Sequence, residues 1–199
     1  MIDRYPGMTR YPALLACALL AACSSGKKDE APPTPSPSAS PAPAPSPSRI
    51  FTYTSLENCP VLESNPDEAG YYLSECKGEG GYRLQVAESD LRQTVTVIAP
   101  GGAKTALDLS AVTGGGFSTL GKKVEWRGAL KDGVFAPDAL ILRHAVVTDP
   151  EGERTVSYLV AITLVPAPCP VARIDPGPQQ NEQARVAADA AGACLKGSA

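Results

Sequence analysis

A proline-rich segment separates the N-terminal part of this chain from the part that can fold. Residues 31–47 consist of eight Pro, four Ser, four Ala and one Thr. This composition contains no large apolar side chains whose burial would offset the entropy of ordering the chain. We therefore expect a disordered tether over residues 23–48. The remaining residues, 49–199, are enough for one domain with a single hydrophobic core.

The first 22 residues have the organisation of a signal peptide. Arg4 and Arg10 supply positive charge, and residues 13–22 form an apolar run that ends at Ala22. Such a run is long enough for the core of a signal peptide and too short to span a bilayer as a helix. Met1 and Met8 both fit as the first residue, because Arg10 follows either of them.

Leu20-Ala21-Ala22-Cys23 resembles the lipobox of bacterial lipoproteins. The resemblance implies that residues 1–22 are removed and that the mature chain begins at Cys23, with lipid on its sulfur and its amino group. Several acyl chains anchor a protein stably in a membrane. Ser follows at positions 24 and 25, which in this family implies the outer membrane where two membranes exist. The expected location is the cell envelope, facing the periplasm or the surface.

Most of the sequence after the tether shows the alternation of apolar and polar residues that is typical of half-buried β-strands. One face of the segment 153–165 carries Val156, Tyr158, Val160, Ile162 and Leu164. The sequence predicts strands over residues 51–54, 82–87, 94–98, 122–128, 139–148 and 153–165. Lys131-Asp132-Gly133 and residues 149–152 predict tight turns between neighbouring strands.

A single helix is predicted over residues 179–193. Pro178 suits the first helical position, which needs no N–H donor, and Gly192 or Gly197 would end the helix. Small residues recur at the helical period, so one face of the helix can lie close to a sheet: Ala184, Ala187, Ala188 and Ala191. The predicted fold class is α+β, mainly antiparallel β-sheet curled toward a barrel, with one C-terminal helix.

Four cysteines lie in the predicted domain, and an even number in an exported chain indicates disulfides. Of the three possible pairings we favour Cys59–Cys76 and Cys169–Cys194. The first would close the N-terminal region on itself, and the second would fix the end of the helix to the chain that leaves the last long strand. The alternative is a zinc site, which needs closely spaced Cys or His pairs that this sequence lacks. We expect no metal and no cofactor.

The charge of the chain excludes a general nucleic-acid binder. The predicted domain has 14 Lys and Arg against 18 Asp and Glu, a net charge of −4. Binding to a nucleic acid requires clustered positive charge.

Four arginines fall on or beside the predicted strands: Arg83, Arg92, Arg127 and Arg143. Arginines that share a face could bind an anionic glycan or a carboxylate through paired hydrogen bonds. Trp126, next to Arg127, would add a stacking plane. The alternative is that these arginines pair with Glu88, Glu125 or Asp138 on the strand surfaces and that Trp126 belongs to the core.

His144 is the single histidine of the chain and therefore the single candidate for an imidazole base. A hydrolase would need it beside a serine such as Ser157 and an acid such as Asp138 or Asp149. No Ser lies in a G-x-S-x-G motif that would mark a nucleophile. His144 is also in phase with the apolar residues of its predicted strand, which favours a core histidine with a satisfied hydrogen bond.

A second resemblance is to a group of small proteobacterial envelope proteins. It is carried by scattered segments: residues 53–56, Cys59, residues 80–82, residues 86–92 and residues 125–127. The resemblance implies a compartment and no mechanism. The expected function is that of a membrane-anchored, non-enzymatic binding or assembly module, whose partner is another envelope protein or a cell-wall glycan. The alternatives are an inhibitor of a lysozyme-like hydrolase, which the acidic domain would suit, and an envelope hydrolase that uses His144.

Overall fold

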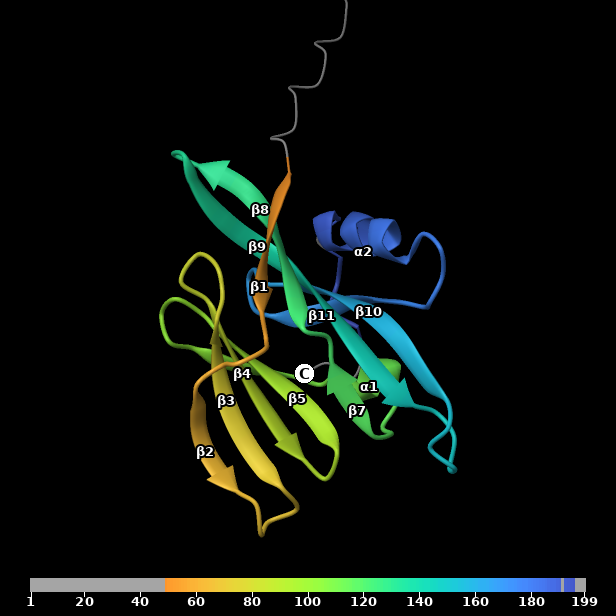
Figure 1. Ribbon diagram of the computed structural model, residues 1–199. Helices are drawn as coiled ribbons and strands as arrows, with labels where there is room; N and C mark the ends of the chain where they lie inside the picture. Colours follow the sequence, from red (N-terminus) through yellow and green to blue (C-terminus); the bar gives the residue numbers. More distant parts are fainter. Residues whose placement is uncertain (1–48, 191, 196–199) are drawn as a thin grey trace, which may run out of the picture. The chain divides into compact units, whose positions relative to one another are not determined.

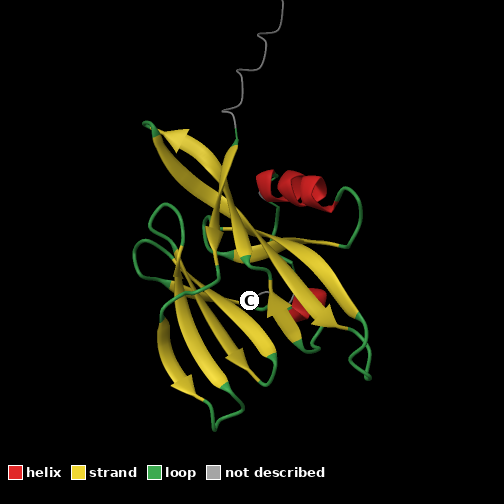
Figure 2. Ribbon diagram, viewed as in Figure 1, coloured by secondary structure: helices red, strands yellow, loops and turns green. Residues whose placement is uncertain are grey.

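The computed structural model describes residues 49–190 and 192–195. These residues form an α+β domain that consists mainly of antiparallel β-sheet (Figures 1 and 2). The strands are β1 (Ile50–Ser55), β2 (Val61–Asn65), β3 (Tyr71–Lys77), β4 (Arg83–Ser89), β5 (Arg92–Ile98), β6 (Lys104–Leu107), β7 (Ser118–Leu120), β8 (Lys123–Lys131), β9 (Val134–Val147), β10 (Thr155–Thr163) and β11 (Cys169–Ile174). The helices are α1 (Ser110–Thr113) and α2 (Gln180–Asp189).

The strands belong to one sheet that curls into a half-barrel (Figure 1). Its main path runs β1-β8-β9-β7-β5-β4-β3-β2, with β6 beside β5 and with β10 and β11 beside β9. All pairs are antiparallel except β5–β7, which is parallel. The long strand β9 is central because β8 and β7 follow one another along one of its edges while β10 pairs along the other.

The β8–β9 hairpin illustrates how the local sequence shapes the sheet. Asp132 and Gly133 both have positive φ, as the predicted two-residue turn requires. The register shifts between Arg127 and Gly128, opposite Pro137. Proline cannot donate to a ladder and is accepted at such a bulge. A Cβ on Gly128 would lie 2.1 Å from the carbonyl oxygen of Ala136, so this position requires glycine.

Two clusters of buried side chains form on the two faces of the sheet. The larger cluster contains Trp126, Leu84, Leu140 and Leu142, which are fully buried. The smaller cluster lies under α2, where Ala184 and Ala188 pack against the sheet. Small residues at these two positions allow the helix to lie close to β9 and β10, as the helical spacing predicted.

The structure confirms the predicted fold class and each predicted strand, with shifted bounds, and adds elements that the pattern did not predict. The additions are β2, β3, β6, β7, β11 and the four-residue helix α1. Helix α2 ends at Asp189, before either predicted glycine, and Pro178 precedes its N-cap residue Gln179. The expectation that β10 is half-buried is wrong from Leu159 onward, because α2 and the main core cover its two faces.

Both predicted disulfides are confirmed. Cys59 is bonded to Cys76, and Cys169 is bonded to Cys194. The second bond joins the start of β11 to the chain after α2, so it fixes the helix to the sheet. Within residues 49–190 and 192–195, neither helix has the length and apolar character needed to cross a membrane. The predicted signal peptide, Cys23 and the tether lie outside the described residues.

Candidate binding site between helix α2 and the sheet

The residues that the sequence offered as candidates for ligand binding lie on different faces of the sheet. Successive side chains of a strand point to opposite faces, so Arg143 and His144 diverge on β9, as Trp126 and Arg127 do on β8. Trp126 lies in the main core and His144 is buried on the same face of the sheet, whereas Arg127 and Arg143 lie on the face that carries α2. These residues therefore do not form one site, because alternate side chains of a strand point to opposite faces.

Trp126 is a core residue, as the alternative interpretation held. Its side chain is fully buried, and its indole N–H donates a hydrogen bond of 2.7 Å to Oγ1 of Thr54. The ring lies against Tyr82, with 6.0 Å between the ring centroids. Gly78 makes room for it, because a Cβ there would lie 2.5 Å from the indole. Trp126 therefore cannot stack on a ligand.

Two of the arginines pair with neighbouring carboxylates away from α2. Arg83 on β4 has its Nε 3.3 Å from Glu75 on β3. Arg92 on β5 forms an ion pair with Asp90 and lies over the ring of Phe117, 4.9 Å from its centroid. Arg83 and Arg92 therefore pair with carboxylates at the surface of the sheet, as the alternative interpretation held. Their partners are Glu75 and Asp90, and not the expected Glu88, Glu125 or Asp138.

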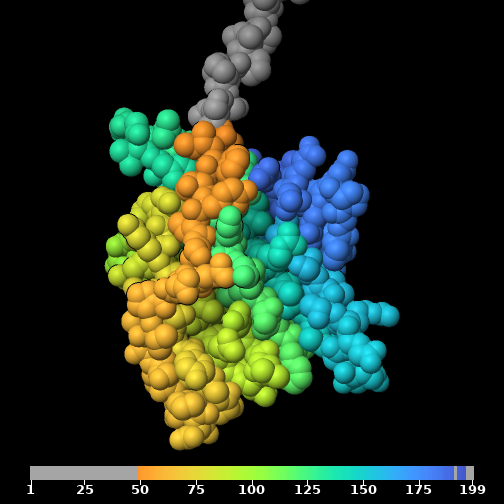
Figure 3. All heavy atoms as spheres, viewed as in Figure 1, coloured from red at the N-terminus to blue at the C-terminus, as the bar shows by residue number. Residues whose placement is uncertain are grey.

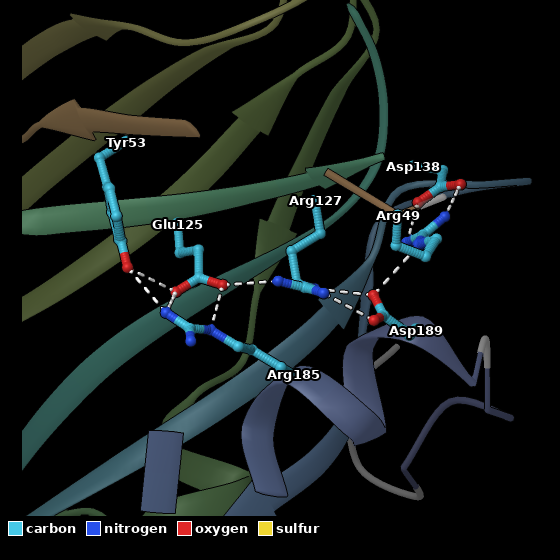
Figure 4. Close-up of polar contacts among 7 residues, drawn as sticks. All are labelled: Arg49, Tyr53, Glu125, Arg127, Asp138, Arg185 and Asp189. Carbon is cyan, nitrogen blue, oxygen red and sulfur yellow. Dashed lines mark hydrogen bonds and ion pairs between the residues drawn. The ribbon is translucent and has the colours of Figure 1, made fainter. Parts of the chain in front are cut away.

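Arg127 belongs to a network of ion pairs and hydrogen bonds that joins β1, β8, β9 and α2 (Figure 4). Its Nη1 donates to Glu125 at 2.8 Å, and its Nε and Nη2 donate to the two oxygens of Asp189 at 2.7 and 2.6 Å. Arg49 extends the network from Asp189 to Asp138. The expected pairing of Arg127 with Glu125 is thus observed, and its guanidinium is occupied.

Glu125 is bonded from three sides, which keeps it ionised although it is buried. Burial by itself raises the pKa of this carboxyl, but hydrogen bonds from Arg185, Tyr53 and Arg127 outweigh burial and the net pKa is lowered. The pKa of Asp189 is likewise lowered, because hydrogen bonds from Arg127 and Arg49 outweigh its burial. The network is therefore a fixed set of charges that connects α2 to the sheet.

Beside this network is a pocket of about 180 Å³ between α2 and the sheet. Three cationic side chains line it, Lys123, Arg143 and Arg185, with the single carboxylate of Glu125. Arg143 donates to two neutral oxygens, Oγ of Ser157 at 3.0 Å and Oε1 of Gln180 at 3.1 Å. Among the described residues, neither Arg143 nor Lys123 has a carboxylate within 4.0 Å. The pocket thus has an excess of positive charge.

Aromatic side chains from β1 adjoin this pocket. Tyr53 lines it, and Phe51 packs edge-on against Tyr53 with 5.6 Å between the ring centroids. Both rings are about half exposed, at 49% for Phe51 and 48% for Tyr53. Arg185 lies over Phe51, 4.8 Å from the ring centroid. In Figure 3, β1 (orange) lies along the surface beside the segment of α2 (blue). The exposed aromatic surface therefore comes from β1 and not from Trp126.

His144 is not assembled with the residues that a hydrolase would need. It is 1% exposed, and its Nδ1 lies 2.8 Å from Oγ1 of Thr113. Ser157 pairs in register with Ala145, one residue along β9 from His144, so its side chain points to the opposite face and bonds Arg143. Asp138 binds Arg49, and Asp149 accepts backbone N–H groups of its own turn. The structure does not form a Ser157–His144–acid arrangement.

Sequence reasoning missed Lys123, Arg185, Asn181 and Tyr53 as pocket residues. Lys123, Glu125 and Arg127 alternate along β8, so the sequence does indicate a charged strand face. Nothing local indicates that α2, about 60 residues further along the chain, supplies Arg185 and Asp189 to that face.

Comparison of the chain with protein-family models, with curated proteins and with solved structures finds no match. In the part of the chain that the structure describes, no three His, Cys, Asp or Glu side chains gather as they would around a metal ion.

Proposed function

We propose that this chain is a lipid-anchored protein of the cell envelope that acts as a non-enzymatic binding module. Residues 1–22 direct export, Cys23 carries the lipid, and residues 23–48 hold the domain away from the membrane, which we take to be the outer membrane. The domain binds a carboxylate-bearing cell-wall glycan in the pocket between α2 and the sheet. Another envelope protein that presents a carboxylate is the alternative partner.

The compartment is supported by the lipobox sequence and by the two disulfides. Cys23 stands at the end of an apolar run and after two small residues, as lipid attachment requires. Disulfides form and persist in oxidising compartments and are rare in the cytosol. All four cysteines of the domain are paired, which suits an exported protein.

The proposal of a carboxylate-bearing ligand rests on one observation. Arg143 and Lys123 have no carboxylate partner within the described part of the chain, although the domain is acidic overall. Arginine pairs with a carboxylate through two parallel hydrogen bonds, and Arg143 is positioned by Ser157 and Gln180. The half-exposed ring of Tyr53 lines the same pocket and offers flat apolar area beside these cations. A sugar ring with a carboxylate substituent matches both features.

Binding is tested with two sugars that differ in a carboxylate-bearing lactyl ether, which N-acetylmuramic acid has and N-acetylglucosamine lacks. We expect the full chain to bind the acidic sugar more tightly, and Arg143→Met to remove the preference. Arg83→Met is the matched control, since Arg83 lies on β4 and pairs with Glu75. Equal binding of the two sugars, or the same loss in Arg83→Met, would contradict the proposal. Inhibition of a lysozyme by the chain without sugar binding would favour the inhibitor alternative.

Anchoring is tested separately by labelling cells with a fatty-acid analogue such as alkynyl palmitate. We expect Cys23→Ser to abolish the label and to release the protein from the membrane fraction. Cys17→Ser is the control, because Cys17 lies within the predicted signal peptide and should be removed with it. Retention of label in Cys23→Ser would show that lipid is attached elsewhere.

A further inference from the structure

A second cavity lies on the face of β9 opposite to Arg143. Its volume is about 310 Å³, and it lies between the segment 107–116 and strands β5, β7 and β9. Leu107 and Leu109 supply apolar wall, and His144 contributes the one imidazole. Because alternate residues of β9 face opposite sides of the sheet, this cavity is separate from the pocket under α2.

Within the cavity wall, His144 carries a nitrogen without a partner. Its Nε2 is buried and has no hydrogen-bond partner among the described residues. A buried polar atom left unsatisfied is costly, and such atoms are rare in folded proteins. The other nitrogen, Nδ1, is occupied by Thr113, which is not part of the cavity wall. His144 lines the cavity and Thr113 does not, so Nε2 is the ring nitrogen that is left for a ligand bound there.

The contacts of Thr113 determine what Nε2 can do. Its hydroxyl has a single hydrogen, which Oγ1 donates to the carbonyl oxygen of Leu109 at 2.9 Å. Oγ1 therefore accepts from His144, so Nδ1 carries the hydrogen of the neutral ring. Burial lowers the pKa of His144, which keeps the ring neutral. Nε2 then presents a lone pair, and it requires a donor.

The two charged residues that line the cavity, Arg92 and Asp108, already have polar partners. Arg92 is bound to Asp90. Asp108 accepts hydrogen bonds from Oγ of Ser110 at 2.7 Å and from the backbone N–H of Ala111 at 3.0 Å, and these bonds lower its pKa. An anionic ligand would therefore find no free cation among these residues, and a cationic ligand would lose its hydration at the buried apolar wall of Leu107 and Leu109. The chemistry of the cavity favours an uncharged ligand.

We propose that this cavity binds a small, uncharged, mainly apolar molecule with one hydroxyl group, and that the hydroxyl donates to Nε2 of His144. An apolar cavity of about 150 Å³ accommodates benzene. The present cavity has roughly twice that volume, so a two-ring aromatic alcohol fits it. Leu107 and Leu109 contact the rings, and the unpaired nitrogen selects the alcohol over the hydrocarbon of the same shape.

The test compares naphthol with naphthalene, which has the same rings and no hydroxyl. We expect the full chain at neutral pH to bind naphthol about tenfold more tightly, the effect of one buried hydrogen bond. His144→Phe keeps an aromatic ring but removes the acceptor, so the preference should disappear while naphthalene still binds. Arg143→Met, which alters the opposite face of β9, should leave the preference unchanged.

A measurement on the unaltered chain keeps the test decisive if His144→Phe does not fold. The chain has one histidine, so its ring nitrogens give unambiguous NMR signals. Naphthol should shift the Nε2 signal and naphthalene should leave it in place. Equal affinity for the two compounds, or an Nε2 signal that naphthol leaves unchanged, would overturn the proposal and indicate that the nitrogen is satisfied by water alone.

Discussion

Asp189→Asn should destabilise the domain strongly, although the substitution changes few atoms. Asp189 is the last residue of α2, and its two carboxylate oxygens accept from Nε and Nη2 of Arg127. Arg127 is 5% exposed. The amide of Asn has one accepting oxygen and no charge, so half of this paired contact is lost and the buried guanidinium keeps only Glu125 as a charged partner.

The expected size of the effect follows from the burial of the two partners. Removing one member of a buried ion pair costs about 3–5 kcal/mol. The side chain of Asp189 is 28% exposed and Arg127 retains Glu125, so we expect about 2–3 kcal/mol at this site. A negative charge at the C-terminus of a helix is unfavourable, and its removal returns about 0.5 kcal/mol. The net loss is about 2 kcal/mol, a factor of about 30 in the unfolding equilibrium.

The assay is urea unfolding of the full chain with both disulfides intact. Asp90→Asn is the matched control, because Asp90 also pairs with an arginine but its side chain is 65% exposed. An exposed ion pair contributes about 0–1 kcal/mol, so this variant should unfold close to the parent chain.

A double-mutant cycle separates the ion pair from other effects of the substitution. Adding Arg127→Met to Asp189→Asn removes the uncompensated charge, so we expect a coupling energy of at least about 1 kcal/mol between the two positions. If Asp189→Asn unfolds within about 0.5 kcal/mol of the parent chain, or if the two substitutions are additive, the argument from burial is wrong.

Three further predictions concern the disulfide, the packing of α2 and the dependence of stability on pH. Replacing Cys169 and Cys194 together by Ser should lower the unfolding free energy by about 3.5 kcal/mol in urea titrations, from the loop of 25 residues that the bond closes. Ala188→Leu should cost about 1–3 kcal/mol by overpacking the buried contact between α2 and the sheet, whereas Val186→Ala, at a position 66% exposed, should change the unfolding temperature little. Burial lowers the pKa of His144 in the folded state, so the unfolded state binds its proton first as the pH falls. The contribution of His144 to stability should be full above about pH 6.5 and fall by up to about 1.4 kcal/mol per pH unit below it. His144→Phe should abolish this slope between about pH 5 and pH 6.5, above the range in which the carboxyls of Glu125 and Asp189 take up protons.

Much of the fold could be predicted from the sequence because its determinants are local. Asp132 and Gly133 adopt the positive φ angles of a tight turn, which these two residue types accept readily. Alternation of apolar residues predicted β9 and β10, and the spacing of Ala184 and Ala188 predicted the buried side of α2. The two disulfide pairings that the sequence favoured are also confirmed, and each joins cysteines within 25 residues of one another.

The elements that were not predicted lack such a local pattern. All five residues of β2 are exposed, so no apolar face marks it as a strand, and it forms by pairing with β3. Strand β7 has three residues and is held between β5 and β9. Such strands depend on hydrogen bonds to partners elsewhere in the chain, which single-sequence patterns do not report.

The sequence by itself determined that Arg127 lies on the face of its strand opposite to Trp126, and that Arg143 lies on the face of its strand opposite to His144, because side chains alternate along every strand. It could not determine that the two arginines share one face of the sheet, or which partner each of them would have. Helix α2 brings Asp189 to Arg127 and only neutral groups to Arg143, so one arginine is neutralised and the other is left with its charge facing a pocket. That difference arises from the register of β8 on β9 and from the position at which α2 packs, and both depend on the burial of side chains that lie far apart in the sequence.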